Sequence, residues 1–271
     1  LEAYINNTED LLIAFPVGGT GYDSQYRNMG ETENKGFEAT LTWHAVNKKD
    51  WGIDINGNIG FNKNKIKDLG AMEDFGWNSR WASTEIGQDY WLAVGHSVGQ
   101  IRGYQNAGRY EVDDFTGYDS KTGKWILKEG VPDATPVIGT VRPGSLKLVD
   151  QPTEEGGVGN GTIGEEDNVI IGDVNPDFTG GFGINVRAYG FDLSAQFNFS
   201  VGNEIEFTST GKYQYRNMIT EMADGKRWTN LNEDGTLCND PAKLAEMNKN
   251  TTMWSPYMSK MVLTDWAIED A

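Results

Sequence analysis

Apolar and polar side chains alternate along several unusually long stretches of this chain. The stretch 36–46 places Phe, Ala, Leu and Trp on one parity and Glu, Thr and His on the other. Such a period of two indicates a β-strand, because successive side chains point to opposite faces of a sheet. After the turn-type residues 47–50, the stretch 51–61 repeats the pattern with Trp, Ile and Phe. The sequence therefore predicts an antiparallel hairpin with one apolar and one polar face.

A second hairpin of the same kind is predicted further along the chain. Its arms are 177–188 and 191–201, and they are joined by a tight turn at Tyr189 and Gly190. Strands of soluble proteins average about five or six residues, whereas a transmembrane barrel strand needs about nine to eleven, tilted by about 45°. The arms of both hairpins match the second length. The sequence therefore predicts an all-β fold that contains an antiparallel transmembrane β-barrel segment.

The aromatic residues of the first hairpin lie near both ends of its arms. Trp43 and Trp51 lie near the turn, whereas Phe37 and Phe61 lie at the open end. Membrane barrels carry an outward apolar band about 25 Å tall with aromatic girdles at both interfaces. The placement of the aromatic residues thus agrees with the barrel prediction.

The segments between the predicted strands are of very unequal length. Tight turns close the hairpins, whereas long loops are expected over 62–176 and 202–265. Short turns on one side and long loops on the other are typical of outer-membrane barrels, whose long loops are extracellular. Such loops are hard to explain in a compact soluble domain. A further hairpin is expected over 1–15, with its turn at Asn6 to Asp10.

Composition excludes several other classes of protein. Glycine makes up 34 of 271 residues, which disfavours a helical bundle. The net charge of −17 has the wrong sign for binding nucleic acid or an anionic membrane surface. The single cysteine, Cys238, excludes an internal disulfide and a cysteine-based zinc site. No apolar run approaches the roughly 18 residues of a transmembrane helix, so any membrane crossing must use strands.

Five motifs, taken together and in order, resemble a known family. The chain is similar over essentially its whole length to the C-terminal barrel portion of the SusC/RagA-type TonB-linked outer-membrane transporters of Bacteroidetes. The segments that carry the resemblance are Asn34-Lys35-Gly36-Phe37-Glu38, Gly60-Phe61-Asn62-Lys63-Asn64-Lys65-Ile66, Gly99-Gln100-Ile101-Arg102-Gly103-Tyr104, Ile170-Ile171-Gly172-Asp173-Val174-Asn175-Pro176-Asp177-Phe178 and Tyr189-Gly190-Phe191-Asp192-Leu193-Ser194.

The resemblance implies a function in the import of bulky nutrients, usually oligosaccharides and sometimes peptides. Transport would proceed through a plugged barrel of about 22 strands in the outer membrane of a Gram-negative bacterium. A SusD-like surface lipoprotein would cap the barrel, and the TonB–ExbB–ExbD complex would supply energy. We then expect residues 1–271 to be part of one C-terminal barrel domain. The plug domain would lie upstream of Leu1 and the last strands beyond Ala271.

Aromatic residues in the first long loop are candidates for contact with a ligand. Sugar rings stack on flat aromatic faces, and aromatic residues are enriched at interfaces. The alternative is equally physical, because a loop of this length needs a small core of its own. The least regularly placed of these residues are the leading candidates, together with one tyrosine of the third motif: Trp77, Trp81, Trp91 and Tyr104.

A calcium site is a further possibility at the end of the same loop. The resembling family usually has an Asp-x-Asn-x-Asp-Gly-x-Ile run followed by Asp at this place, and Asn160 and Asp167 match its end. The start of the run is interrupted, so Asp150 would have to fold back to supply an oxygen, because calcium takes six to eight oxygen ligands. The simpler alternative is an ordered acidic turn without an ion.

No motif of the sequence indicates an enzyme. Its two histidines are far apart without a His-Glu-x-x-His pattern. The main alternative to a transporter is a secreted all-β module that binds glycans or another protein. Its strands would form a two-layer sandwich, and a second sheet would then bury the apolar parity.

Overall fold

The computed structural model describes residues 1–17, 19, 21–22, 24–79, 86–153, 157–206, 225–255, 260 and 262–270. Strands dominate this part of the chain, so the predicted all-β class is confirmed. The helical elements are short: η1 (Val112–Asp114), α1 (Thr135–Ile138), η2 (Glu165–Asp167), α3 (Pro241–Asn248) and η4 (Asp265–Ala267). Within the described residues, none of the helices has the length and apolar character needed to cross a membrane.

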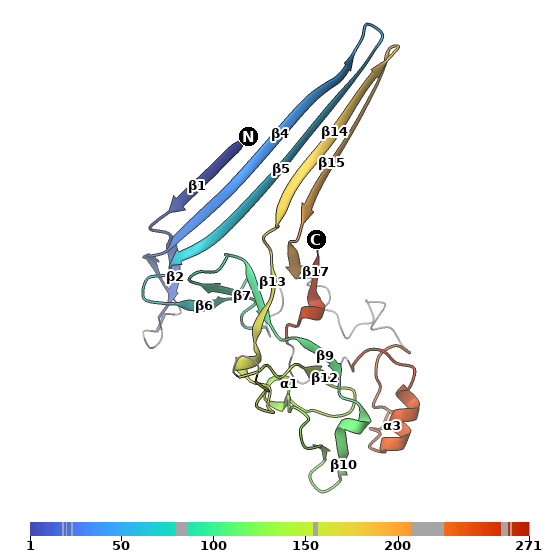
Figure 1. The fold of residues 1–271 in the computed structure, drawn as a ribbon. Coiled ribbons are helices and arrows are strands. Elements are labelled where there is room, and N and C mark those ends of the chain that lie inside the picture. Colours follow the sequence, from blue (N-terminus) through green and yellow to red (C-terminus); the bar gives the residue numbers. More distant parts are fainter. Residues whose placement is uncertain are drawn as a thin grey trace.

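Five strands form one antiparallel sheet, here called the long sheet, which extends away from the rest of the molecule (Figure 1). In spatial order its strands are β1 (Glu2–Thr8), β4 (Glu31–Asn47), β5 (Trp51–Asp68), β14 (Phe178–Ala188) and β15 (Phe191–Val201). The two predicted hairpins are therefore neighbours, because β5 pairs with β14. Their turns also meet, since the Tyr189 amide donates a hydrogen bond of 2.8 Å to the carbonyl of Asp50.

The predicted second hairpin is confirmed almost to the residue. Ala188 pairs with Phe191 across the predicted two-residue turn. Tyr189 and Gly190 have φ values of 49° and 88°, as a type I′ turn requires. The first hairpin is longer than predicted, because β4 begins at Glu31 and β5 continues to Asp68. Apart from the buried Ile66, the added residues are polar or charged without apolar alternation, so the pattern did not reveal them.

The predicted hairpin over 1–15 is wrong. β1 pairs with β4, with Ala3 opposite Phe37. The second predicted arm is β2 (Leu12–Pro16), which pairs instead with β3 (Ser24–Asn28). The long sheet offers β1 an extended edge, and at Gly36 this edge leaves space for a neighbouring ring. A Cβ built on Gly36 would lie 2.1 Å from Cζ of Tyr4, so the tyrosine ring packs directly on the glycine backbone.

The two long connections, predicted as loops, contain further strands and form what we call the loop body, made of the described residues in 69–177 and 202–270. One sheet has the order β13 (Val169–Asp173), β8 (Gln100–Gly103), β7 (Tyr90–Ala93) and β6 (Asp74–Trp77). The described part of the loop body also contains three separate strand pairs: β9 (Asn106–Arg109) with β12 (Leu146–Leu148), β10 (Phe115–Asp119) with β11 (Lys124–Leu127), and β16 (Glu204–Glu206) with β17 (Ile268–Asp270).

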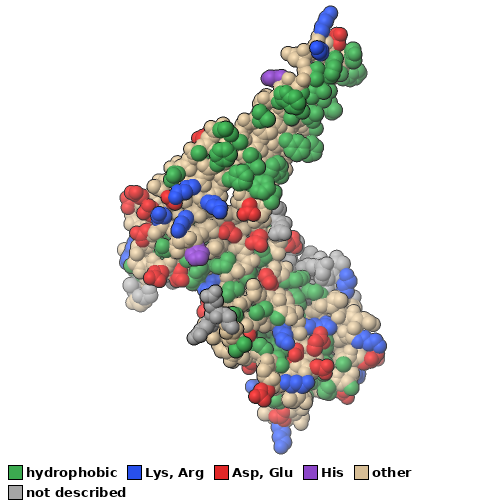
Figure 2. Space-filling view, viewed as in Figure 1, with side chains coloured by type: hydrophobic (Ala, Val, Ile, Leu, Met, Phe, Trp, Pro, Cys, Tyr) green, Lys and Arg blue, Asp and Glu red, His purple; other side chains and the backbone are tan. Residues whose placement is uncertain are grey.

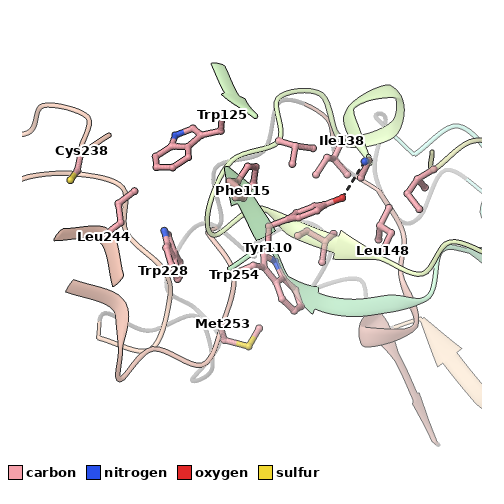
Figure 3. Packing of buried hydrophobic residues seen from close by; sticks show 14 residues of the cluster. Tyr110, Phe115, Trp125, Ile138, Leu148, Trp228, Cys238, Leu244, Met253 and Trp254 are labelled. Atoms are coloured by element: carbon pink, nitrogen blue, oxygen red, sulfur yellow. Dashed lines mark hydrogen bonds between the residues drawn. The ribbon is translucent and has the colours of Figure 1, made fainter. Parts of the chain in front are cut away.

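Residues from both connections share one hydrophobic core (Figure 3). Tyr110 is fully buried, and its hydroxyl donates a hydrogen bond of 2.5 Å to the Pro132 carbonyl and accepts one of 3.2 Å from the Ala134 amide. Trp228 and Leu244, from the second connection, belong to the same cluster. The core explains several loop aromatics as packing residues, Trp125 among them, as the structural alternative predicted.

Candidate functional site

The apolar parity of the long sheet lies on an uncovered face, with exposed side chains near both ends and in the middle. We call this surface the apolar face. In Figure 2 it is the band of hydrophobic side chains, in green, along the extended sheet. The exposed fractions of Leu41, Trp43 and Phe197 are 70%, 58% and 52%. Ile55 is half-buried, because its neighbours on the flanking strands, Trp43 and Ile184, cover it from the sides. No described residue forms a second sheet over this face.

Aromatic residues mark both ends of the apolar face, and lysines follow at the far end. Trp51 and Phe191 lie beside the turns, and Phe37 pairs with Phe61 at the far end. Two residues beyond that pair, Lys35 faces Lys63 on the same side of the sheet. The ten residue steps from Trp51 to Phe61 span about 33 Å of strand, or about 23 Å of height at a tilt of 45°. This height matches the apolar band of a membrane barrel.

The opposite face of the long sheet is polar and internally hydrogen-bonded. The Nδ1 atom of His44 lies 2.6 Å from Oδ1 of Asp54 on the neighbouring strand. The Ser194 hydroxyl donates a hydrogen bond of 2.6 Å to the side-chain oxygen of Asn185. These groups are largely exposed, which suits a surface in contact with water. The long sheet therefore has one apolar face and one polar face.

Two of the predicted ligand residues, Trp77 and Trp91, lie in β6 and β7, and a third, Tyr104, directly follows β8. Trp77 pairs with Tyr90, and Trp91 pairs with Gly76. Because side chains alternate between faces, Trp77 and Trp91 lie on opposite faces and cannot form a common stacking surface. Trp81 lies outside the described residues. Of the three that the structure describes, Trp91 and Tyr104 both lie near one arginine.

That arginine, Arg102, helps to line a cavity of about 370 Å³. Its guanidinium carbon lies 4.0 Å from the centre of the Trp91 ring, a cation–π contact. Its Nε donates a hydrogen bond of 2.9 Å to the Asn168 carbonyl, and its Nη1 lies 3.3 Å from Oε1 of Glu165. Tyr104 and Glu165 also line the cavity. Two strands, β8 and β13, position these groups by pairing with each other.

The surroundings of the cavity disfavour ionisation of the phenol of Tyr104. Burial, assisted by the negative charge of Glu165, raises the pKa of Tyr104 to about 12, against the opposing effect of Arg102. As for any tyrosine, the hydroxyl is a hydrogen-bond donor at neutral pH, and the raised pKa extends this range to higher pH. Sequence analysis missed Arg102 and Glu165. The signal in the sequence was the position of Arg102 between Ile101 and Gly103 in a short strand-like segment. The structure shows that these two neighbours are buried.

The predicted calcium ligands form an ordered turn. Asp150 accepts hydrogen bonds from the amides of Asn160 and Gly161, at 3.1 and 2.8 Å. Asp167 is fully buried and accepts bonds from the amides of Gln151 and Gly164, at 2.6 and 2.7 Å. Asp150 does fold back to the loop, but its carboxylate binds backbone amides there.

The side-chain oxygen of Asn160, the third predicted ligand, accepts a bond of 2.8 Å from the Thr162 amide. Across the described ranges, no three His, Cys, Asp or Glu side chains are grouped to hold a metal ion. These bonds favour the acidic turn without an ion, and calcium binding stays a prediction.

Known proteins resemble this chain in sequence and in fold. TonB-dependent receptor P3 of Formosa agariphila is 32% identical over 204 residues, which cover 74% of this chain and 18% of the receptor. TonB-dependent receptor SusC of Bacteroides thetaiotaomicron is 34% identical over 77 residues, which cover 27% of this chain and 8% of SusC. No family model matches the sequence.

A solved structure described as the RagAB peptide transporter shares the fold, with a TM-score of 0.59 and 21% identity. The alignment covers 99% of this chain and 25% of that one. The chain spans about a fifth of the length of the three Formosa agariphila receptors that it matches. Taken with the exposed apolar face and the motifs in their order, these similarities identify the chain as a member of the SusC/RagA family of TonB-dependent receptors.

Proposed function

We propose that the chain forms part of the wall and the loop body of a closed, plugged barrel in the outer membrane of a Gram-negative bacterium. The exposed apolar face is the observation that carries this proposal. In water a face with Leu41 at 70% and Phe191 at 82% exposure would be costly, whereas hydrocarbon is its natural environment. The polar face then lines the lumen.

Both edges of the long sheet support closure into a barrel. β1 and β15 are its outer strands, and each pairs on one side only within the described residues. Unpaired strand edges cannot remain in a bilayer, because their amides and carbonyls would lack hydrogen bonds. Further strands of the same protein would pair with both edges, so that residues 1–271 contribute to one barrel domain.

The barrel would import a bulky nutrient, an oligosaccharide or a peptide. Energy would come from the TonB–ExbB–ExbD complex acting on a plug domain, and a SusD-like lipoprotein would cap the barrel on the side of the loop body, which would be extracellular. The residues of this chain would shape the path and contact the nutrient without performing chemistry. A secreted sandwich module is the weaker reading, because it requires a cover over the apolar face.

Deletion of the gene in its source bacterium tests this proposal. We expect the complete receptor in the outer-membrane fraction, and we expect the deletion strain to lose growth on one class of oligosaccharide or peptide. A strain without TonB should show the same loss, and the wild-type gene should restore growth to the deletion strain. Secretion of the protein into the medium, or undiminished growth on every nutrient tested, would contradict the proposal.

A further inference from the structure

The cavity beside Arg102 holds a guanidinium that is fixed in place and only partly used. The side chain is 18% exposed, and Trp91 and the Asn168 carbonyl fix its orientation. Its contact with Glu165 is long, at 3.3 Å, and the Glu165 side chain is 74% exposed. Within the described part of the chain, Nη2 makes no hydrogen bond. A guanidinium held in this way has donors left for a ligand.

The other walls of the cavity define what kind of group could enter. Tyr104 offers a neutral hydroxyl, and Ile86, Val262 and Leu263 are apolar. The volume of about 370 Å³ is at the small end of the range of ligand sites, roughly 300–1,000 Å³. The cavity thus suits a single residue or sugar ring of a larger solute. A cationic group would be repelled by Arg102.

We propose that this cavity binds a carboxylate group of the imported solute, with Arg102 as its principal ligand. This proposal rests on the proposed function as an importer. The planar guanidinium matches a carboxylate with two parallel hydrogen bonds, and Trp91 already orients the plane. The incoming carboxylate replaces the exposed Glu165, which is free to turn into solvent. A neutral hydroxyl could not compete with Glu165 in this way.

The carboxylate could belong to an acidic sugar or to the C-terminus of a peptide, and four probes distinguish them. Binding to the complete receptor in detergent is measured by calorimetry with tetragalacturonate and with its methyl ester. The same measurement uses a tetrapeptide with a free C-terminus and its C-terminal amide. We expect one acid to bind about 10- to 100-fold more tightly than its neutral counterpart, the effect of a hydrogen bond to a charged group.

Three variants assign the effect to the cavity. Arg102→Gln should abolish the preference for the acid, whereas Glu165→Gln should strengthen acid binding because it removes the competing carboxylate. The matched control is Arg109→Gln: Arg109 also lies over a tryptophan, 4.7 Å from the ring of Trp228, and pairs with a glutamate, but outside the cavity. Arg109→Gln should keep the preference.

Equal binding of acid and neutral probes to the wild type would overturn the proposal, as would the absence of binding by both acids. It would also fall if Arg102→Gln kept the preference or Glu165→Gln left acid binding unchanged. If Arg102→Gln does not fold, the exposed Glu165 variant decides. These outcomes leave the importer function intact, because outer-membrane location and TonB-dependent growth do not depend on the cavity.

Discussion

Replacement of Leu41 by arginine should destabilise the receptor in a bilayer by far more than its exposure suggests. Leu41 lies in one row across the long sheet with Gly57, Phe182 and Phe197. Gly57 is six residues from Trp51, at the turn, and four from the far end of the apolar band. At about 2.3 Å of height per residue, the row lies about 9–14 Å inside both boundaries.

An arginine at that depth in a membrane barrel costs about 2–4 kcal/mol, and near the interface about 0–1 kcal/mol. We therefore expect Leu41→Arg to lower the free energy of unfolding by about 2–3 kcal/mol. If water covered the same face, a residue that is 70% exposed would change stability by at most about 0.5 kcal/mol. The two environments thus predict clearly different results.

The assay is urea titration of the complete receptor folded into phospholipid vesicles. Thr42→Arg is the matched control, because Thr42 is the next residue along β4, is also exposed and faces the polar side. We expect Thr42→Arg to change stability by less than about 1 kcal/mol. Equal effects of the two variants, or no effect of Leu41→Arg, would refute the reasoning that the apolar face meets hydrocarbon.

Three further predictions concern the loop body. Tyr110→Phe should lower its stability by about 1–3 kcal/mol, measured by thermal unfolding, because the Ala134 amide and the Pro132 carbonyl lose their partner. The raised pKa of Tyr104 means that the folded state holds this proton more tightly, so stability should fall from pH 10 to about 12, and less steeply in Tyr104→Phe. Calorimetric titration of the complete receptor with calcium tests the acidic loop: heat that Asp167→Ala removes would support a bound ion, whereas heat unchanged by that variant would exclude the predicted site.

The strands that carry the apolar face could be predicted closely from the sequence, because apolar and polar side chains must alternate along each of them. A strand with one apolar and one polar face must alternate strictly, so β14 and β15 were predicted to within a residue. This alternation is required only where the strand carries the apolar face. Apart from the buried Ile66, the extension of β5 to Asp68 is polar, and its pairing with β4 depends on the partner strand and not on its own pattern.

The loop body could not be predicted in the same way, because long-range contacts determine it. β8 pairs with β13, which follows it by more than sixty residues, and this pairing brings Arg102 to Glu165. Single aromatic residues carry little information about such pairings. In the structure Trp125 is a core residue and Trp91 contacts the guanidinium of Arg102. Trp77 is exposed and lies on the opposite face of the β6–β7 sheet from Trp91. The resemblance to a family indicated the fold but not these contacts.

Accessibility of spin labels in bilayers tests the central claim most directly. Labels at Leu41 and Leu193, on the apolar face, are compared with labels at Thr42 and Gln196, on the polar face, in the complete receptor. The account predicts that a lipid-soluble quencher relaxes the first pair and that a water-soluble metal complex relaxes the second. Protection of Leu41 and Leu193 from the lipid-soluble quencher would contradict the assignment of the long sheet to a membrane wall.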